Sequence, residues 1–367
     1  MSRWAWAEVS ASAIEHNVRE LASVVAPAQM WAVVKADGYG HGSVLAARAA
    51  LAGGAHGLCV ALVQEGVTLR AAGVDAPILV LSEQPSAQTA TALAAGLQLT
   101  VYTREGVEAI AVAGGVAHPV HLKVDTGMRR VGASVSLALE VAAAIQASPA
   151  TSLAGVFTHL AVADEPANPF TTLQLDRFDE ALAVLRTAGY HPPLVHAANS
   201  SGALAHPRAR YGMVRAGIAI YGISPGAGVD HLCRSLQPAL SLKARVSYVK
   251  RVAAGESISY GLRHTFLRDS TVATLPIGYA DGVPRRLHSV EGTVLLGGRH
   301  RPIVGVVTMD QLMLDCGDDA VAVGDEAVLI GTQGAHTITA ADWAARLDTI
   351  AYEIVCGLST RIERRPV

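Results

Sequence analysis

The sequence is poor in several residue classes, and each shortage excludes a kind of protein. Only four cysteines occur among 367 residues, and they are scattered at positions 59, 233, 316 and 356. This count excludes a disulfide-rich secreted scaffold, and the spacing matches no Cys or Cys/His zinc motif. We therefore expect reduced thiols, no metal site and a cytoplasmic location.

Charge and long apolar runs are also scarce. Charged residues make up 16% of the chain, the formal net charge is −2, and no long basic run occurs, so we expect no nucleic-acid partner. No apolar stretch reaches the ~18 residues needed to span a bilayer. The start, MSRWAWAEVSASAIEHNV, lacks the basic and apolar regions of a signal peptide. We expect no membrane partner either.

What the chain does contain is a regular alternation of short apolar runs and helix-like stretches. Half of the residues are hydrophobic, which permits a large core. Alternation of this kind favours an N-terminal (β/α)₈ TIM-like barrel, with an open doubly wound sheet as the structural alternative. The expected strands cover residues 30–35, 57–63, 77–82, 97–102, 119–125, 153–159, 193–199 and 213–219.

The alternation stops near Gly222, and β-like runs with glycine turns begin at Leu240. This change predicts a second, mostly β domain. We place the barrel at 8–230 and the C-terminal β domain at 231–367, and expect segment 1–7 to pair with the β domain. Within the barrel, residues 12–25 read as an amphipathic helix before the first strand, and residues 200–207 leave room for only a short helix.

The first expected strand ends in a lysine. Trp31 to Val34 are apolar, and Lys35 is followed at once by a glycine-rich loop. Active sites of such barrels lie at the carboxyl ends of the strands. A lysine in an enclosed, partly apolar site has a lowered pKa, and its amine can then form a Schiff base. Taken alone, Lys35 also fits a structural lysine that pairs with Asp37.

Other strand ends carry polar groups as well. Together they ring one mouth of the barrel: Lys123, Asp125, Arg130, His159, His196, Asn199, Ser200 and Arg215. The loops after strands seven and eight form the usual phosphate site of such barrels. Here they offer hydroxyls at Ser200–Ser201 and backbone N–H groups at Gly217–Ile218. A phosphate seat and a Schiff-base lysine together predict pyridoxal 5′-phosphate, an electron sink for a carbanion at Cα.

Nine segments carry a family resemblance. The chain resembles the alanine racemase family, in order and spacing, from residue 32 to residue 361: AVVKADGYGHG, VHLKVDTGMRRVG, FTHLAVADE, HAANSSG, MVRAGIAIYG, ISYGLRHTF, TLPIGYADG, VTMDQ and YEIVCGLSTR. The resemblance implies the barrel, the β domain and the cofactor. It also implies alanine as substrate, D-alanine for peptidoglycan as product, and a homodimer with active sites shared between subunits.

The resemblance also implies roles for individual residues. Lys35 would hold the cofactor and act as the base on the D face, and Tyr260 of the partner subunit would act as the base on the L face. Lys123 matches a lysine that family members often carry as a carbamate. The implied cofactor contacts are Tyr39, Arg130, His159, Asn199, Ser200, Arg215, Gly217, Ile218 and Tyr352. The implied substrate contacts are Arg130, Tyr279, the backbone of Met309 and the nearby Asp310, with Tyr279 and Met309 contributed by the partner subunit.

Arg215 would face the pyridine nitrogen of the cofactor. Because arginine does not readily give up its proton, the ring nitrogen would stay an unprotonated acceptor and a weaker electron sink, which limits side reactions. Two positions depart from the family. Arg129 stands where glycine is frequent, and Thr308 where cysteine is frequent.

Three other functions fit parts of the sequence. A decarboxylase of the same fold type usually places glutamate at the pyridine nitrogen, where this chain has Arg215. A non-catalytic protein that binds pyridoxal phosphate would lack the second domain and Tyr260. A racemase of another amino acid, such as serine or lysine, would use the same residues.

Overall fold

The computed structural model describes residues 3–367, and these form two units that we describe separately. The barrel unit comprises Ser12–Gly38 and Ser43–Pro238. The β unit comprises Tyr39–Gly42, Ala239–Val367 and the N-terminal segment through Ala11. The main division therefore follows Pro238, eight residues after the expected end of the barrel at residue 230. Residues 1 and 2 of the expected pairing segment lie outside the described residues.

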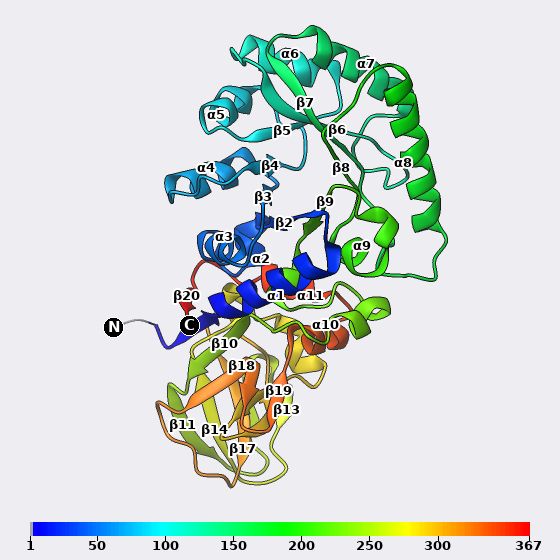
Figure 1. Cartoon of the computed structure of the whole chain (residues 1–367). Helices are drawn as coiled ribbons and strands as arrows, with labels where there is room; N and C mark the ends of the chain where they lie inside the picture. The colour runs from blue at the N-terminus through cyan, green and yellow to red at the C-terminus, as the bar shows by residue number, and fades with distance from the viewer. Residues whose placement is uncertain (1–2) are drawn as a thin grey trace. The chain divides into compact units, whose positions relative to one another are not determined.

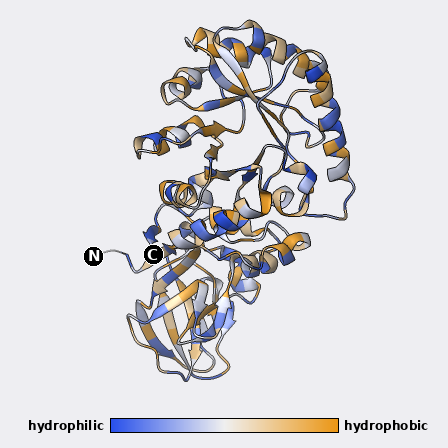
Figure 2. Ribbon diagram, in the orientation of Figure 1, coloured by the Kyte–Doolittle hydropathy of each residue, from blue (hydrophilic) through white to orange (hydrophobic). Residues whose placement is uncertain are grey.

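Eight parallel strands close into a barrel, which confirms the predicted fold and excludes the open sheet. Each strand overlaps its predicted run, and Trp31 lies opposite Arg215 where the last strand meets the first. The strands are largely hydrophobic (Figure 2), as expected for strands buried on both faces. They are β2 Gln29–Val33, β3 Gly57–Val60, β4 Ile78–Val80, β5 Gln98–Val101, β6 His118–Lys123, β7 Thr151–Phe157, β8 Leu194–His196 and β9 Met213–Ala216.

Helices follow the strands and lie on the outside of the barrel (Figure 1). Side-chain caps define several of their starts; for example, Ser134 accepts a hydrogen bond from the backbone N–H of Leu137 at the start of α7. The short helix expected after the seventh strand is present as α9. The helices are α1 Ala11–Val25, α3 Ser43–Ala52, α4 Val63–Ala71, α5 Thr89–Ala94, α6 Arg104–Val112, α7 Val135–Ala147, α8 Phe170–Thr187 and α9 Ser200–Ala205.

The β unit contains a mixed sheet ordered β11-β14-β17-β16-β15-β18-β10-β1-β20, with β19 paired to β18. The N-terminal strand β1 lies antiparallel to β10 and parallel to β20, which joins both chain ends to one sheet edge. The strands are β1 Ala5–Val9, β10 Leu240–Arg245, β11 Tyr248–Val252, β14 Ser270–Leu275, β15 Thr293–Leu296, β16 Arg299–Val304, β17 Leu312–Gly317, β18 Glu326–Gln333, β19 His336–Ile338 and β20 Glu363–Pro366.

Two smaller parts of the β unit carry predicted site residues. A two-stranded hairpin, β12 Ser257–Ile258 and β13 His264–Thr265, encloses Tyr260. Helices α10 Ala340–Leu347 and α11 Ala351–Cys356 follow the sheet, and α11 carries Tyr352. Over residues 3–367, no helix combines the length and apolar character that crossing a membrane requires.

Candidate active site

Lys35 begins a left-handed turn rather than an open loop. Strand β2 ends two residues earlier, and Ala36, Asp37 and Gly38 all have φ between 52° and 62° with ψ between 43° and 51°. Residues with a Cβ pay about 1–2 kcal/mol each for this conformation. The turn is secured by the Asp37 carboxylate, which accepts from the Ser43 N–H at 2.8 Å, and by Glu65, which accepts from the Ala36 N–H at 2.6 Å.

Four cations act on one another at the mouth of the barrel. Burial, together with Arg215, Arg130 and Lys35, lowers the pKa of Lys123 to about 8, and Asp125 opposes this shift. Burial and the same cations hold the pKa of His159 well below its usual range. The mouth therefore carries a surplus of positive charge, which favours an anionic ligand.

Arg215 lies at the centre of this charge and is buried. Its guanidinium donates to the carbonyl oxygens of Thr158 at 2.9 Å and Ala197 at 3.1 Å, and to Nδ1 of His196 at 2.6 Å. Burial lowers the pKa of Arg215 to about 10, so it remains a cation at neutral pH. These contacts fix both the position and the charge of the guanidinium.

Arg215 also sets the tautomers of two buried histidines. Because a guanidinium only donates, Nδ1 of His196 is an acceptor and its Nε2 carries the proton. Nε2 of His196 lies 2.9 Å from Nδ1 of His121, and Nε2 of His121 lies 2.9 Å from Oε1 of Gln98. Each hydrogen bond therefore runs in one direction, from Arg215 to Gln98, and both imidazoles are neutral.

The expected phosphate seat is a compact cluster of backbone amides and one hydroxyl. Ser200 begins α9, and its oxygen accepts from the N–H of Gly217 at 2.9 Å and from that of Ala219 at 3.4 Å. Asn199 caps α9 by accepting from the N–H of Gly202. These interactions hold the loops after β8 and β9 together, and the cap fixes the side-chain oxygen of Asn199, which stays a predicted cofactor contact.

In the β unit, Tyr39 and Tyr352 lie near each other. Their ring centroids are 6.0 Å apart, and Tyr39 is buried. Arg364 fixes this loop by donating to the carbonyl oxygen of Gly40 at 2.9 Å. A Cβ at Gly40 would lie 2.0 Å from the carbonyl oxygen of Val355, so the loop approaches α11 as closely as glycine allows. The two phenols predicted to contact phosphate are thus held side by side.

The residues predicted to contact substrate lie on two loops joined through their backbones. Thr308 and Met309 accept at their carbonyl oxygens from the N–H groups of Tyr279 and Ala280, each at 3.0 Å. Tyr279 and Met309 are 41% and 52% exposed. Their side chains are therefore presented to solvent by a rigid backbone.

A buried carboxylate supports these loops from within the β unit. The Asp281 side chain is fully buried. Its carboxylate accepts hydrogen bonds from both terminal nitrogens of Arg3, at 2.5 and 2.6 Å, and lies 3.2 Å from Nε of Arg361. Arg361 also pairs with Asp310 at 2.6 Å. Arg3, Asp281 and Arg361 were not predicted as site residues. Asp281 and Arg361 lie in the segments TLPIGYADG and YEIVCGLSTR that resemble the family, but only the fold shows that the N-terminal Arg3 binds Asp281.

Both parts of the chain match one family. Residues 9–225 match the alanine racemase N-terminal domain and residues 239–366 the alanine racemase C-terminal domain. The alanine racemase of Symbiobacterium thermophilum is 50% identical over 363 residues, covering 98% of this chain and 96% of that protein. The alanine racemase of Thermobifida fusca is 46% identical over 371 residues, covering 99% and 98%.

Solved structures of alanine racemases match the fold of this chain over its whole length. The alanine racemase from E. faecalis has a TM-score of 0.93 and 39% identity, with 100% of this chain and 98% of that one covered. The alanine racemase from Bacillus anthracis with bound L-Ala-P has a TM-score of 0.94 and 38% identity, with 100% and 96% covered. The chain belongs to the alanine racemase family. It is therefore an isomerase, which sets aside the decarboxylase and the non-catalytic protein.

The racemase family depends on pyridoxal 5′-phosphate, and the residues present fit that group. The cofactor is an anion with a phosphate and a phenolic oxygen. The barrel mouth offers Lys35, Lys123, Arg130 and Arg215, and the charge of Asp125 opposes the shift at Lys123. At the loops where such barrels bind phosphate, the Ser200 oxygen accepts from the Gly217 N–H, which leaves the Ser200 hydroxyl proton to donate to a phosphate oxygen.

The structure shows the surroundings of both departures from the racemase family pattern, and it gives no reason for arginine in place of glycine at position 129. Arg129 has φ 58°, a left-handed conformation that favours the glycine frequent at this position. Its side chain is exposed and lies 3.9 Å from Asp125, which also accepts from the Arg129 N–H. Thr308 uses its hydroxyl within its own loop, donating to the Gln311 carbonyl at 2.8 Å and accepting from the Gln311 N–H at 3.2 Å.

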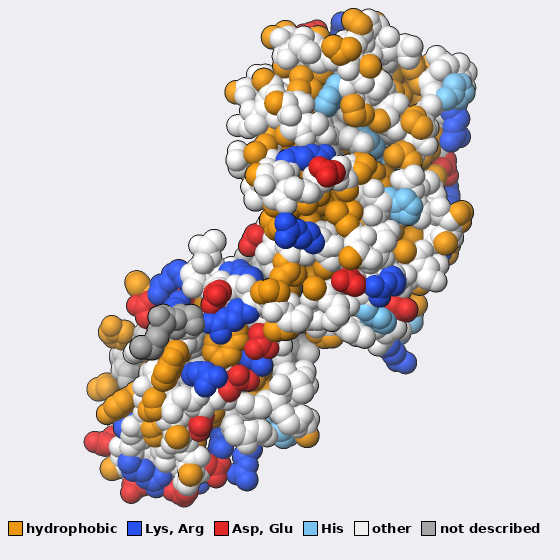
Figure 3. Space-filling view, turned by 60° about the vertical axis from the view of Figure 1, so that its left-hand side comes forward, with side chains coloured by type: hydrophobic (Ala, Val, Ile, Leu, Met, Phe, Trp, Pro, Cys, Tyr) orange, Lys and Arg blue, Asp and Glu red, His pale blue; other side chains and the backbone are white. Residues whose placement is uncertain are grey.

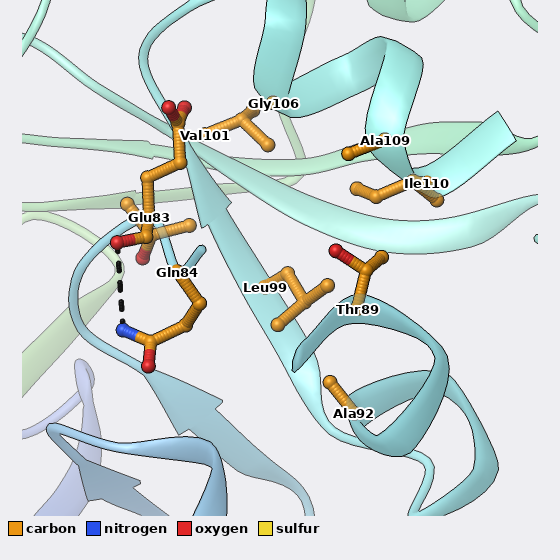
Figure 4. A pocket seen from close by; sticks show the side chains of 10 residues that line it. Glu83, Gln84, Thr89, Ala92, Leu99, Val101, Gly106, Ala109 and Ile110 are labelled. Carbon is orange, nitrogen blue, oxygen red and sulfur yellow. Dashed lines mark hydrogen bonds between the residues drawn. The ribbon is translucent and has the colours of Figure 1, made fainter. Parts of the chain in front are cut away.

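A small cavity in the barrel wall lies outside the predicted site. It measures about 20 Å³ and is lined by residues of β5, α5 and α6, among them Leu99, Thr89 and Ile110 (Figure 4). Its charged residue, Glu83, accepts from the N–H groups of Tyr102 and Thr103 and from the Thr103 hydroxyl. The cavity has room for about one water molecule, so we assign it no catalytic role.

Proposed function

We propose that this protein interconverts L- and D-alanine with pyridoxal 5′-phosphate as cofactor. The observation that carries the proposal is the buried, positively charged barrel mouth, in which Arg215 is held by four acceptors while Lys35 follows the first strand. When bound, the cofactor supplies an electron sink for the bond electrons left at Cα. Lys35 would hold its aldehyde carbon covalently, and Ser200, the Gly217 and Ile218 amides, Tyr39 and Tyr352 would hold its phosphate.

Racemisation requires removal of a proton from one face of Cα and delivery of a proton to the other. We assign the D face to the amine of Lys35 and the L face to the phenol of Tyr260. Two bases on opposite faces perform this exchange without moving the substrate. Arg130, Tyr279 and Met309 would bind and orient alanine, with Asp310 nearby, where it pairs with Arg361.

Arg215 supports this reaction over others that start from the same complex. With the cofactor bound, the Arg215 guanidinium would donate a hydrogen bond to its pyridine nitrogen and keep its own proton. His196, Thr158 and Ala197 already orient the group, so little reorganisation is needed. The cofactor would then be a weaker electron sink, which would favour return of a proton to Cα and limit side reactions. His159, 3.4 Å from Arg215, would help to hold it.

Lys123 is a candidate for carbamylation. Its lowered pKa, about 8, leaves an appreciable fraction of neutral amine for reaction with carbon dioxide. The resulting carbamate would replace repulsion from Arg130 with a charge-assisted hydrogen bond. Native mass measurement should show one added carboxyl group that Lys123→Ala lacks. An unmodified mass in bicarbonate at neutral pH would contradict this assignment.

The active enzyme would be a homodimer in which Tyr260, Tyr279 and Met309 serve the partner's barrel. Their exposure supports this arrangement, since Tyr260 is 74% exposed. We place the enzyme in the cytoplasm, where buried thiols such as Cys59 and Cys316 stay reduced, and infer that its D-alanine serves peptidoglycan synthesis. On the face in Figure 3, the basic side chains of the β unit are interspersed with acidic ones, which does not favour nucleic-acid binding.

A chiral assay tests the function directly. Purified protein loaded with cofactor should convert either enantiomer of alanine to an equal mixture, and should act more slowly on serine and lysine. Borohydride reduction should fix the cofactor to the peptide that contains Lys35. Preferential racemisation of serine or lysine would replace alanine as the substrate, and labelling of another peptide would refute the role of Lys35.

A further inference from the structure

The hairpin that carries Tyr260 contains an unusual backbone conformation one residue earlier. Ser259 has φ 67° and ψ −177°, a region of backbone space essentially restricted to glycine. Gly261 and Leu262 follow with φ 73° and 47°. Strain of this kind persists only where the surrounding structure enforces it, and it is concentrated at functional sites.

The conformation of Ser259 reverses the direction of the tyrosine side chain. In a regular strand, residues 258 and 260 would point to the same face. Ile258 is buried in a core with Val252, Phe266 and Val304, yet Tyr260 is 74% exposed. A regular strand would direct the phenol toward this core. The left-handed φ at Ser259 instead directs it away from the unit.

Two contacts hold Ser259 in this conformation. Its hydroxyl donates to the carbonyl oxygen of Val306 at 3.0 Å. Gly305, which directly follows β16, packs against the serine. A Cβ added at Gly305 would lie only 2.5 Å from the Cβ of Ser259. The carbonyl of Ser259 also accepts from the N–H of Leu262 at 3.1 Å, which closes the turn around Tyr260.

We propose that Ser259 is a positioning residue for the racemisation reaction, because its strained backbone and its bond to Val306 set the orientation of the Tyr260 phenol. The proposal rests on the proposed role of Tyr260 as the base on the L face. Glycine at this position would relieve the strain but allow many other directions for Tyr260. Alanine would keep the strain and lose the anchor.

Stability gives the first test. At an ordinary strand position, glycine is less stable than alanine because it loses more backbone entropy. At Ser259 the order should be reversed, so that Ser259→Gly has a higher urea midpoint than Ser259→Ala in the full chain, with and without cofactor. Glu291, in the turn before β15, is an exposed residue with φ 54° and lies outside the hairpin of Tyr260. Its Gly and Ala variants should show the same order and serve as the matched control.

The second test measures kinetic isotope effects. If Ser259 had a purely structural role, its substitution would leave these isotope effects unchanged. A misplaced base lowers rates strongly, so both Ser259 variants should lose about ten- to a hundred-fold in kcat/KM. If the Tyr260 step is slowed, the deuterium effect with L-alanine labelled at Cα should rise and that with labelled D-alanine should fall. The Glu291 variants should keep wild-type isotope effects.

Several outcomes would overturn the proposal. If Tyr260→Phe is inactive, either of two results would refute the positioning role of Ser259. One is unchanged isotope effects in both Ser259 variants. The other is a Ser259→Ala variant that is as stable as Ser259→Gly. A fully active Tyr260→Phe would instead refute the proposed role of Tyr260, and the positioning role with it. If Ser259→Ala does not fold, Ser259→Gly alone decides through its isotope effects.

Discussion

The histidine chain behind Arg215 predicts that acid destabilises the barrel, and that one substitution removes part of this effect. His121 is buried, and burial together with Arg215 lowers its pKa to about 3. In the unfolded chain its pKa would be about 6.5. The neutral form therefore contributes stability that is fully present above pH 6.5 and is lost as the pH falls toward 3.

The magnitude follows from these two pKa values. At pH 5 His121 is protonated in the unfolded state and neutral in the folded state. This difference lowers the free energy of unfolding by about 2 kcal/mol relative to its value above pH 6.5. His121→Gln removes the titration but preserves the hydrogen-bond pattern, since a glutamine oxygen can accept from His196 and its amide can donate to Gln98. We expect similar stability at pH 7.5 and a loss between pH 7.5 and 5 that is about 2 kcal/mol smaller than in wild type.

Urea unfolding at several pH values measures this difference. Helices α1 and α3 to α9 lie almost entirely in the barrel unit, so circular dichroism at a helical wavelength reports mainly on that unit. His121→Leu serves as a contrast, because it leaves the Nε2–H of His196 and the Gln98 oxygen without partners and should lose stability even at pH 7.5. An identical pH dependence in wild type and His121→Gln would refute the neutral-histidine chain.

Three further substitutions test other parts of the structure. Gly155→Ala would place a Cβ 2.5 Å from Nδ1 of His121, so we expect a loss of about 1–3 kcal/mol in urea unfolding; wild-type stability would show that His121 is not packed there. Arg129→Gly should be about 1 kcal/mol more stable than Arg129→Ala, because φ is 58°; the reverse order would contradict the left-handed turn. Asp281→Asn leaves Arg3 and Arg361 without their buried carboxylate and should lose roughly 3 kcal/mol in thermal unfolding and raise the KM for alanine; an unchanged KM would show that this cluster does not position Tyr279 and Met309.

The barrel could be predicted because its signal is local and repeated. Each strand is a short apolar run followed by a helix-forming stretch, and the polar residues at strand ends are found together at one mouth. We expect segment 1–7 to pair with the β domain, but its partner strand could not be predicted. Strand β1 pairs with β20, more than 350 positions away, and no local pattern identifies that partner. The same holds for Arg3 and Asp281.

The finer features of the site depended on neighbours that sequence patterns do not show. The left-handed turn after Lys35 was unexpected because Ala36 disfavours this conformation and because three successive residues rarely adopt it. His121 lies two residues before Lys123, and alternation along a strand places both on the inner face. The strand pattern therefore places His121 inside the barrel. It does not show that Gly155 leaves space for the imidazole or that His196 forms a hydrogen bond with it.

The central claim is that Lys35 and Tyr260 act as a pair of bases contributed by different subunits. Lys35→Ala and Tyr260→Phe should each be nearly inactive alone. In a mixed dimer, one site would carry both substitutions and the other neither, so random pairing should restore about a quarter of the wild-type rate. If subunit exchange is demonstrated and the mixture remains as inactive as the separate variants, the two bases do not meet across a dimer and this account is wrong.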